Sequence, residues 1–335
     1  MDKHFSELNY QLTVLQDKKD IPIGLFSGKM GLCIYFYYWG RIENNEKYAK
    51  IAEKLIDEIF EQIEMVNSVD VENGLIGIAL GINYLIKNGY VKGDENVILK
   101  DIEDKIFKQV SFNELNEDIF VLMQILYYIR IRKQSFIKES NILFDELTIH
   151  IINNLHSRVE YIRDNKVNFN IDTKLPLFLF VLSEIHQVNI YNSKITRIIH
   201  EITPFILSQY SYLDSKKLYL LWGVGKINKY IKDERLTKFC NLLASNIDIS
   251  ILIDEFRNKN VFINDGISGI CLLMLSLEDN EKQMLDLNTF YTKAIQKIEN
   301  SLIWELSIDP EYLKTHIGLA GYCGVAMILN EIKRL

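Results

Sequence analysis

The sequence predicts an all-α protein in which helices of two kinds alternate and close into two concentric rings, an α/α toroid. Three observations support this prediction. A G-x-x-G tetrapeptide recurs along the chain at a period of about 45–50 residues, which is the signature of a repeat architecture. The 335 residues include only 4 prolines and 16 glycines, a composition that suits helices. Apolar residues such as Ile51, Leu55 and Ile59 recur at helical spacing.

The helices of the first kind are amphipathic, with charged residues on one face and an apolar stripe on the other. Because a single apolar stripe packs against one side only, these helices are expected to lie in the outer ring. We expect them at residues 3–16, 46–66, 95–110, 141–163, 191–210, 233–247 and 286–302.

The helices of the second kind are apolar nearly all round, so they must be buried on every side and form the inner ring. We expect them at residues 28–40, 74–88, 116–132, 174–187, 219–231, 266–278 and 318–333. The third and fourth have no glycine pair and are placed by spacing alone. Seven helices of each kind, in strict alternation, predict one domain that spans residues 1–335.

A glycine pair is expected in the first turn of most inner helices. The clear copies are Gly28-x-x-Gly31, Gly74-x-x-Gly77, Gly266-x-x-Gly269 and Gly318-x-x-Gly321, and a weaker copy is Trp222-Gly223-Val224-Gly225. Glycine inside a helix costs about 0.5–1 kcal/mol relative to alanine, so its repeated use predicts close packing between neighbouring segments. A small residue stands two places after each second glycine: Cys33, Ala79, Cys271 and Cys323. We interpret these cysteines as small packing residues, because free cysteine behaves as a buried hydrophobe.

The composition excludes several classes of partner. The net charge is −7 with acidic and basic residues interspersed, so nucleic acid and anionic membranes are poor partners. No apolar segment approaches the roughly 20 residues needed to cross a bilayer, so we expect no membrane insertion. The start of the chain has no apolar core of a signal peptide, and the 4 cysteines follow no pairing pattern. A cytoplasmic location is therefore expected.

Four motifs together resemble the lanthionine synthetase C-like (LanC-like) family, the cyclases of lanthipeptide biosynthesis. They are Gly24-Leu25-Phe26-Ser27-Gly28-Lys29-Met30-Gly31, Asn73-Gly74-Leu75-Ile76-Gly77-Ile78-Ala79-Leu80-Gly81, Asn264-Asp265-Gly266-Ile267-Ser268-Gly269-Ile270 and Gly318-Leu319-Ala320-Gly321. The resemblance implies a double ring around a central cavity, where a dehydrated peptide receives a cysteine thiol and a thioether ring forms. It also implies a precursor peptide as partner, together with a dehydratase or a partner cyclase.

The chain departs from the family at the catalytic metal. The resemblance implies a zinc ion held by a cysteine of a W-C-x-G motif at the fifth inner helix and by a cysteine and histidine of a C-H-G motif at the sixth. The corresponding residues here are Leu220, Asn264 and Asp265. Zinc prefers sulfur and nitrogen ligands, and leucine offers no ligand atom. We therefore expect no metal site and no other cofactor.

The rim that carries the N-terminal ends of the inner helices is the expected substrate-binding surface. Its candidate residues are Lys174, Tyr219, Trp222, Asn264, Asp265 and His316. Asp265 and His316 are also the candidate catalytic residues, as a general-base pair. Alternatively, Asp265 caps a helix and His316 is a solvated loop residue. Two carboxylates such as Asp265 and Glu117 would instead suit glycoside hydrolysis.

Two classes of function remain open at this point. In the first, the protein is a LanC-like binding subunit that holds a precursor peptide in its cavity without zinc-dependent cyclase chemistry. In the second it is an enzyme, either a zinc-independent cyclase or, with less support, a glycan-active toroid. A zinc-independent cyclase would need another source of thiolate, such as helix N-termini around the cavity.

Overall fold

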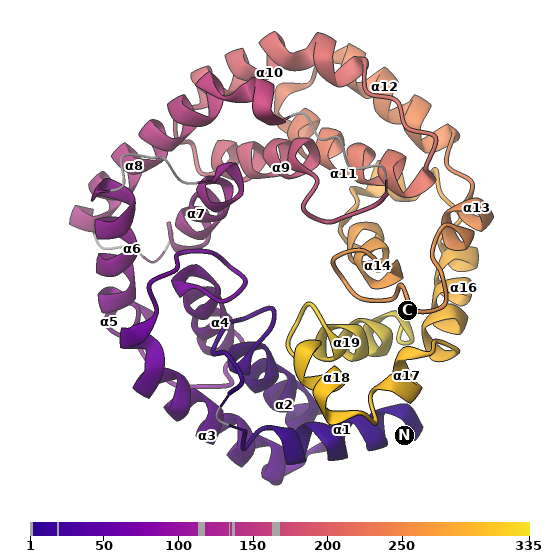
Figure 1. Cartoon of the computed structure of the whole chain (residues 1–335). Coiled ribbons are helices and arrows are strands. Elements are labelled where there is room, and N and C mark those ends of the chain that lie inside the picture. Colours follow the sequence, from indigo (N-terminus) through magenta and orange to yellow (C-terminus); the bar gives the residue numbers. More distant parts are fainter. Residues whose placement is uncertain (1–2, 19, 113–117, 134, 136–137, 163–167) are drawn as a thin grey trace. The chain divides into compact units, whose positions relative to one another are not determined.

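The computed structural model describes residues 3–18, 20–112, 118–133, 135, 138–162 and 168–335, and no strand occurs among them. The chain divides into two compact units. The first comprises Met1–Glu114, Val261–Ile263 and Ile298–Leu335, and the second comprises Leu115–Asn260 and Asn264–Lys297. Each unit is built from a layer of buried helices and a layer of half-exposed helices (Figure 1).

The buried layer of the first unit consists of α2 (Lys29–Glu43), α4 (Leu75–Lys87) and α19 (Tyr322–Ile332). Helix α2 packs against both α4 and α19, so segments from the two ends of the chain lie side by side (Figure 1). The helices outside this layer are α1 (Lys3–Leu15), α3 (Glu46–Gln62), α5 (Glu95–Ile98), α6 (Lys100–Phe112), α17 (Ile303–Leu306) and α18 (Pro310–Thr315), with the 3₁₀ turn η1 (Ile63–Met65).

The buried layer of the second unit runs α7 (Ile119–Arg132), α9 (Lys174–Gln187), α11 (Asp214–Ile231) and α14 (Ile267–Ser276), each packed against the next. The helices outside it are α8 (Lys138–Ser157), α10 (Asn192–Leu207), α12 (Glu234–Ser245), α13 (Ile249–Asp254), α15 (Asp279–Lys282) and α16 (Leu287–Glu299), with the 3₁₀ turn η2 (Val159–Ile162).

The predicted alternation of helix types is confirmed, and the buried helices are those whose sequences are apolar all round. The first residues of two helices, α11 and α19, were predicted wrongly. Helix α11 begins at Asp214 instead of residue 219, because its polar first turn is buried and hydrogen-bonded. Helix α19 begins at Tyr322 instead of residue 318. The short helices α13, α15, α17 and α18 lie in segments that were not predicted to be helical.

The glycine motif has a fixed place in the structure. Its first glycine is the N-cap of α2, α4, α14 and α19, and these N-caps are Gly28, Gly74, Gly266 and Gly321. In the last repeat the pair is therefore Gly321 and Gly324, and the assignment to Gly318 and Gly321 was wrong. The residue in the register of Cys33 is then Ala326, and Cys323 stands three places earlier.

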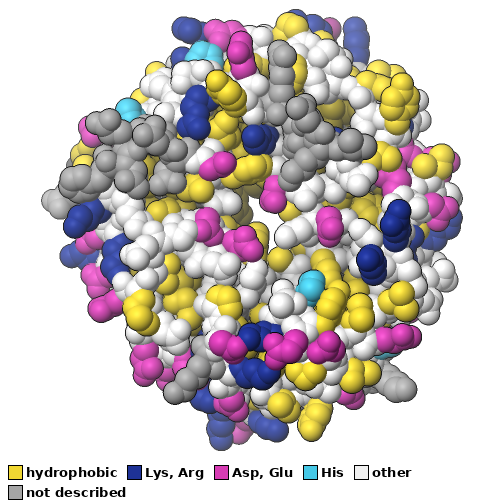
Figure 2. All heavy atoms as spheres, viewed as in Figure 1, with side chains coloured by type: hydrophobic (Ala, Val, Ile, Leu, Met, Phe, Trp, Pro, Cys, Tyr) yellow, Lys and Arg dark blue, Asp and Glu magenta, His cyan; other side chains and the backbone are white. Residues whose placement is uncertain are grey.

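Two features of the described residues are the apolar character of their helices and the charge of the surface they form. None of their helices combines the length and the apolar character that crossing a bilayer requires. Figure 2 shows basic side chains interspersed with acidic ones on the face in view.

Candidate functional site

The N-terminal ends of α9, α11 and α14 meet in the second unit through a short hydrogen-bonded chain. The Tyr219 hydroxyl on α11 donates to the backbone carbonyl of Ile171, which precedes α9. The Ile171 N–H donates to the carbonyl of Asn264, which precedes α14, at 2.7 Å. The structure thus brings together Tyr219 and Asn264, two of the predicted binding residues. Burial raises the pKa of Tyr219 well above its ordinary value, so its hydroxyl stays protonated and serves as a donor.

An aromatic row crosses three neighbouring helices of the buried layer. The Trp222 ring on α11 lies 4.7 Å from that of Phe180 on α9, and Phe180 lies 5.7 Å from Tyr127 on α7. Trp222 also packs against Tyr219, with 5.6 Å between ring centroids. Phe180 and Tyr127 are half-buried, so the row offers an apolar surface with the geometry of aromatic pairs.

Lys174 and Trp222 differ in how their polar atoms are used. Lys174 begins α9, and its ammonium donates to the Tyr161 carbonyl at 3.3 Å and lies 5.7 Å from the Phe120 ring. The indole nitrogen of Trp222 is buried and has no hydrogen-bond partner among the residues described. The predicted binding residues Lys174, Tyr219, Trp222, Asn264 and Asp265 all belong to the second unit.

Leu220 lines a pocket of about 190 Å³ between the two layers of the second unit. The lining residues come from both layers and are Ile162, Thr173, Leu175, Pro176, Phe205, Gln209, Tyr210, Ser211, Lys216, Lys217, Tyr219, Leu220 and Leu243. The prediction that Leu220 opens the fifth inner helix is wrong, because α11 begins at Asp214. Thr173 and Leu175, from the start of α9, line the same pocket.

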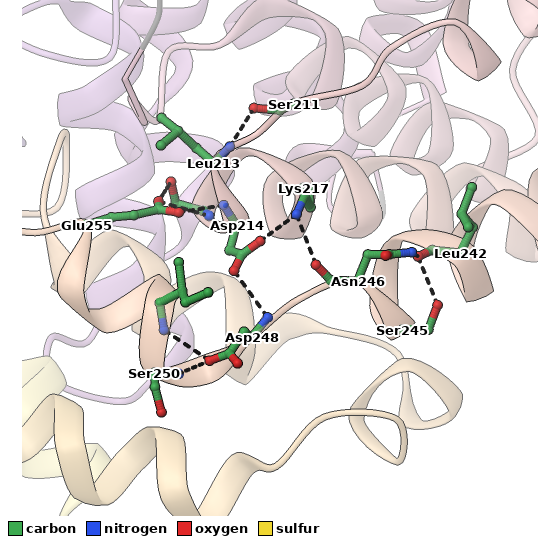
Figure 3. A network of polar contacts seen from close by, with 12 residues as sticks. Ser211, Leu213, Asp214, Lys217, Leu242, Ser245, Asn246, Asp248, Ser250 and Glu255 are labelled. Carbon is green, nitrogen blue, oxygen red and sulfur yellow. Dashed lines mark hydrogen bonds and ion pairs between the residues drawn. The ribbon is translucent and has the colours of Figure 1, made fainter.

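The first turn of α11 is held by a polar network that the sequence did not reveal (Figure 3). The Glu255 carboxylate accepts hydrogen bonds from the backbone N–H groups of Asp214 at 2.5 Å and Ser215 at 3.2 Å. The Asp214 carboxylate accepts from Lys217 Nζ at 2.6 Å and from the Asp248 N–H at 3.1 Å. These contacts satisfy free N–H groups at the helix start and pair a buried lysine with a buried carboxylate.

We expect Glu255→Ala to lower the free energy of unfolding by about 1–3 kcal/mol, because it leaves the buried N–H groups of Asp214 and Ser215 without an acceptor. Urea denaturation followed by circular dichroism measures the change. Glu234→Gln, an exposed carboxylate in the first turn of α12, is the control and should stay within about 0.5 kcal/mol of the original protein. Equal stability of the two variants would contradict the role given to Glu255.

The residues present do not fit a zinc ion held by two thiolates and an imidazole. Leu220 has no ligand atom, and Asn264 offers a side-chain amide where a thiolate is required. All four cysteines are buried, and burial raises the pKa of Cys240 and of Cys323 to about 12. Within the described ranges, no group of three or more His, Cys, Asp or Glu side chains is placed to hold a metal ion.

His316 is held in a defined orientation in the first unit. Its ring stacks between Tyr312, at 4.2 Å, and Phe262, at 4.9 Å. Its Nδ1 lies 2.9 Å from both the Tyr312 carbonyl oxygen and the Thr315 hydroxyl oxygen. His316 is half-exposed and lies at the C-cap of α18, so the structure leaves open both the catalytic interpretation and that of a solvated loop residue.

Of the two candidate carboxylates, Asp265 and Glu117, only Asp265 lies in the described part of the chain. Asp265 is exposed and precedes the N-cap Gly266, so the expectation that it caps a helix was wrong. It belongs to the second unit and His316 to the first, and their pairing stays a prediction. Glu117, the other carboxylate considered for glycoside hydrolysis, lies outside the described residues.

Comparisons with known proteins show a likeness at the level of fold. No protein-family model matches the chain, and neither does any curated protein. Among solved structures, the chain is similar to nisin cyclase, with a TM-score of 0.61, 13% sequence identity and coverage of 98% of each chain. An identity this low establishes the fold and nothing finer. The protein has the all-α, α/α toroid fold of that enzyme.

Proposed function

We propose that residues 1–335 form a single LanC-like domain that binds a precursor peptide in the biosynthesis of a lanthipeptide or another modified peptide, without zinc-dependent cyclase chemistry. The likeness to nisin cyclase over nearly the whole chain supports the family and the kind of substrate. The claim that zinc-dependent chemistry is lacking rests on the residues at the positions of the expected zinc ligands. Residues Leu220, Asn264 and Asp265 replace the ligands, and the four thiols are buried.

The peptide is proposed to lie along the buried layer of the second unit, near the starts of α9, α11 and α14. The aromatic row of Tyr127, Phe180 and Trp222 supplies apolar contact for side chains. Exposed Asn264 and Asp265 supply polar groups beside it. A binding subunit of this kind would act in the cytoplasm and present the peptide to a dehydratase or a partner cyclase.

The proposal predicts peptide binding without ring formation. We expect fluorescein-labelled peptides that contain dehydroalanine and cysteine to bind, measured by fluorescence anisotropy, and the purified protein to contain no stoichiometric zinc by elemental analysis. After incubation with added Zn²⁺, every peptide thiol should still react with N-ethylmaleimide, as mass spectrometry will show. Thioether formation leaves the peptide mass unchanged, so alkylation is the informative readout.

Variants of the aromatic row provide the control for that experiment. Phe180→Ala should weaken peptide binding about tenfold, since losing one aromatic contact costs on the order of 1–2 kcal/mol. Tyr10→Ala, on an exposed tyrosine of the first unit, should leave binding unchanged. Stoichiometric zinc, or loss of alkylatable thiol with Zn²⁺ present, would refute the absence of zinc-dependent chemistry.

One observation favours a second candidate, a zinc-independent cyclase. The His316 ring is held between two aromatic rings and at Nδ1 by Tyr312 and Thr315, and in the tautomer with its proton on Nδ1 the Nε2 lone pair serves as a base. Nε2 would take the proton of a peptide thiol, the sulfur would bond to the dehydroalanine β-carbon, and the protonated Nε2 would return that proton to the α-carbon. Loss of alkylatable thiol that persists with a chelator and disappears in His316→Gln would establish this alternative.

A further inference from the structure

Glu281, in the short helix α15 of the second unit, is a buried carboxyl that no described residue neutralises by an ion pair. Its side chain is only 2% exposed. Two lysines of α11, Lys226 and Lys229, pair instead with the neighbouring Glu278, at 2.7 Å and 3.0 Å. Burying a carboxylate without a cation is costly, so the position of Glu281 suits the neutral carboxylic acid.

The carboxyl of Glu281 occupies the space that a side chain would fill at Gly225 of α11. A Cβ added at Gly225 would overlap the Glu281 Oε1 atom, so any other residue there would displace the carboxyl. The second oxygen, Oε2, accepts a hydrogen bond from the Glu278 N–H at 3.2 Å. The second glycine of the weak motif at 222–225 thus allows the Glu281 carboxyl to dock against α11.

Glu281 and Cys240 line one pocket of about 300 Å³ between α11, α12 and α15. Cys240, on α12, is 6% exposed. Burial raises the pKa of this thiol, and the charge of Glu281 adds to the increase, so the two side chains interact electrostatically. Asn228 and Asn241 also line the pocket, so a carboxylate that left its place beside α11 would meet a polar surface.

The charges around Glu281 favour its neutral form. Burial raises the pKa of Glu281 to about 7, and the charge of Glu278 adds to this increase, while that of Lys226 opposes it. Lys282, on the same helix as Glu281, donates to the Leu275 carbonyl at 2.9 Å. The charged and titratable groups on the elements around Glu281 are Lys226, Lys229 and Lys232 of α11, Cys240 of α12, and Glu278, Asp279 and Lys282 in or next to α15.

We propose that Glu281 is a proton-controlled latch: its neutral carboxyl holds α15 against α11, and loss of the proton releases α15 and exposes the Cys240 thiol. Helix α15 comprises only Asp279–Lys282, and short segments of this kind open locally while the remainder of a protein stays folded. The inference does not depend on the proposed function, because it involves no peptide and no metal.

The direction of the pH dependence follows from the two forms of the latch. The closed form keeps the proton up to about pH 7, and the open form, with a solvated carboxyl, releases it near pH 4.5. Opening therefore becomes more frequent as the pH rises from about 4.5 to 7, and it levels off above that range.

Thiol labelling at Cys240 measures this opening in the full chain. The protein is treated with 4,4′-dithiodipyridine at pH 5 and pH 7.5, and mass spectrometry follows each cysteine. The labelling rate of Cys240 is divided by its rate in Glu281→Gln at the same pH, which cancels the pH dependence of the thiol chemistry itself. We expect this ratio to rise about fiftyfold from pH 5 to pH 7.5, as carboxyl pKa values of 4.5 in the open form and about 7 in the closed form require.

Two further variants test the geometry of the latch. Asp279→Asn changes an exposed carboxylate on the same helix, and it should keep the pH dependence of the original protein. Gly225→Ala places a methyl group where the Glu281 carboxyl lies, so the labelling of Cys240 relative to Glu281→Gln should be fast already at pH 5. Circular dichroism confirms that each variant is folded.

Cys271 distinguishes local opening from global unfolding, because it lies on α14 of the same unit and is 0% exposed. At pH 7.5 Cys240 should react at least about tenfold faster than Cys271, and about 1 M urea should accelerate labelling mainly at Cys271, since the effect of urea scales with the surface exposed. A ratio that is the same at both pH values would overturn the latch. So would equal rates and equal urea dependence at Cys240 and Cys271, whatever peptide or metal the protein binds.

Discussion

At pH 8, replacing Glu281 with glutamine is expected to raise the free energy of unfolding by about 3 kcal/mol, and at pH 4 the same change is expected to have little effect. Glu281 lies in α15 and is only 2% exposed. Burial raises its pKa from 4.5 to about 7, and the charge of Glu278 adds to the increase. The difference between these values, at about 1.4 kcal/mol for each pKa unit, gives the expected magnitude.

The direction of this pH dependence follows from the number of protons bound in the folded and the unfolded states. Between about pH 4.5 and 7 the folded protein keeps a proton on Glu281 that the unfolded chain has released, so stability falls as the pH rises through this range. Below pH 4.5 the carboxyl is protonated in both states. Glutamine cannot ionise, and it retains an acceptor for the Glu278 N–H that now bonds to Glu281 at 3.2 Å.

Urea denaturation at pH 4, 6 and 8 measures this effect. The comparison of Glu281→Gln with the original protein isolates this residue, because every other titrating group contributes to both curves. Glu278→Gln is the control: it removes the charge that pairs with Lys226 at 2.7 Å and Lys229 at 3.0 Å, so it should not stabilise the protein at pH 8. A Glu281→Gln advantage that is the same at pH 4 and pH 8 would contradict the assignment.

The alternation of buried and half-exposed helices could be predicted because it depends on local pattern alone. A segment such as Leu75–Lys87 has apolar residues on all sides, which suits only a buried helix. The start of α11 could not be predicted in this way. Ser215 and Lys217 are polar and read as a loop, and they are buried only because Glu255 and Asp214 satisfy them. Glu255 lies 41 residues from Asp214, beyond the reach of any local pattern.

Of the predicted binding residues, the structure links two through a hydrogen-bonded chain. Tyr219 and Asn264 were placed on one rim, and the structure joins them through Ile171, whose role depends on a loop that the sequence does not specify. The pocket at Leu220 was missed, because a void between four helices depends on how their side chains pack. The last glycine pair was misassigned because Gly318, Gly321 and Gly324 offer two overlapping copies of one motif, and only the N-cap at Gly321 distinguishes them.

Within α2, Gly31→Ala is expected to lower the free energy of unfolding by about 3 kcal/mol or more, whereas Gly40→Ala is expected to raise it by about 0.5–1 kcal/mol. A Cβ at Gly31 would lie 2.3 Å from the Leu25 carbonyl oxygen and 2.7 Å from the Leu319 N–H nitrogen. A Cβ at Gly40 meets nothing closer than 3.4 Å. Urea denaturation of the two single variants measures both effects.

The contrast between the two variants tests the reason for the glycine motif, because both replace glycine by alanine inside one helix and share the same gain in helix propensity. Any difference must come from what the added methyl group meets. At Gly31 the obstacles are backbone atoms of Leu25 and Leu319, which cannot rotate away as a side chain can. If Gly31→Ala were as stable as Gly40→Ala, close backbone approach would not explain the glycine, and a role of this motif in ligand binding would become the better explanation.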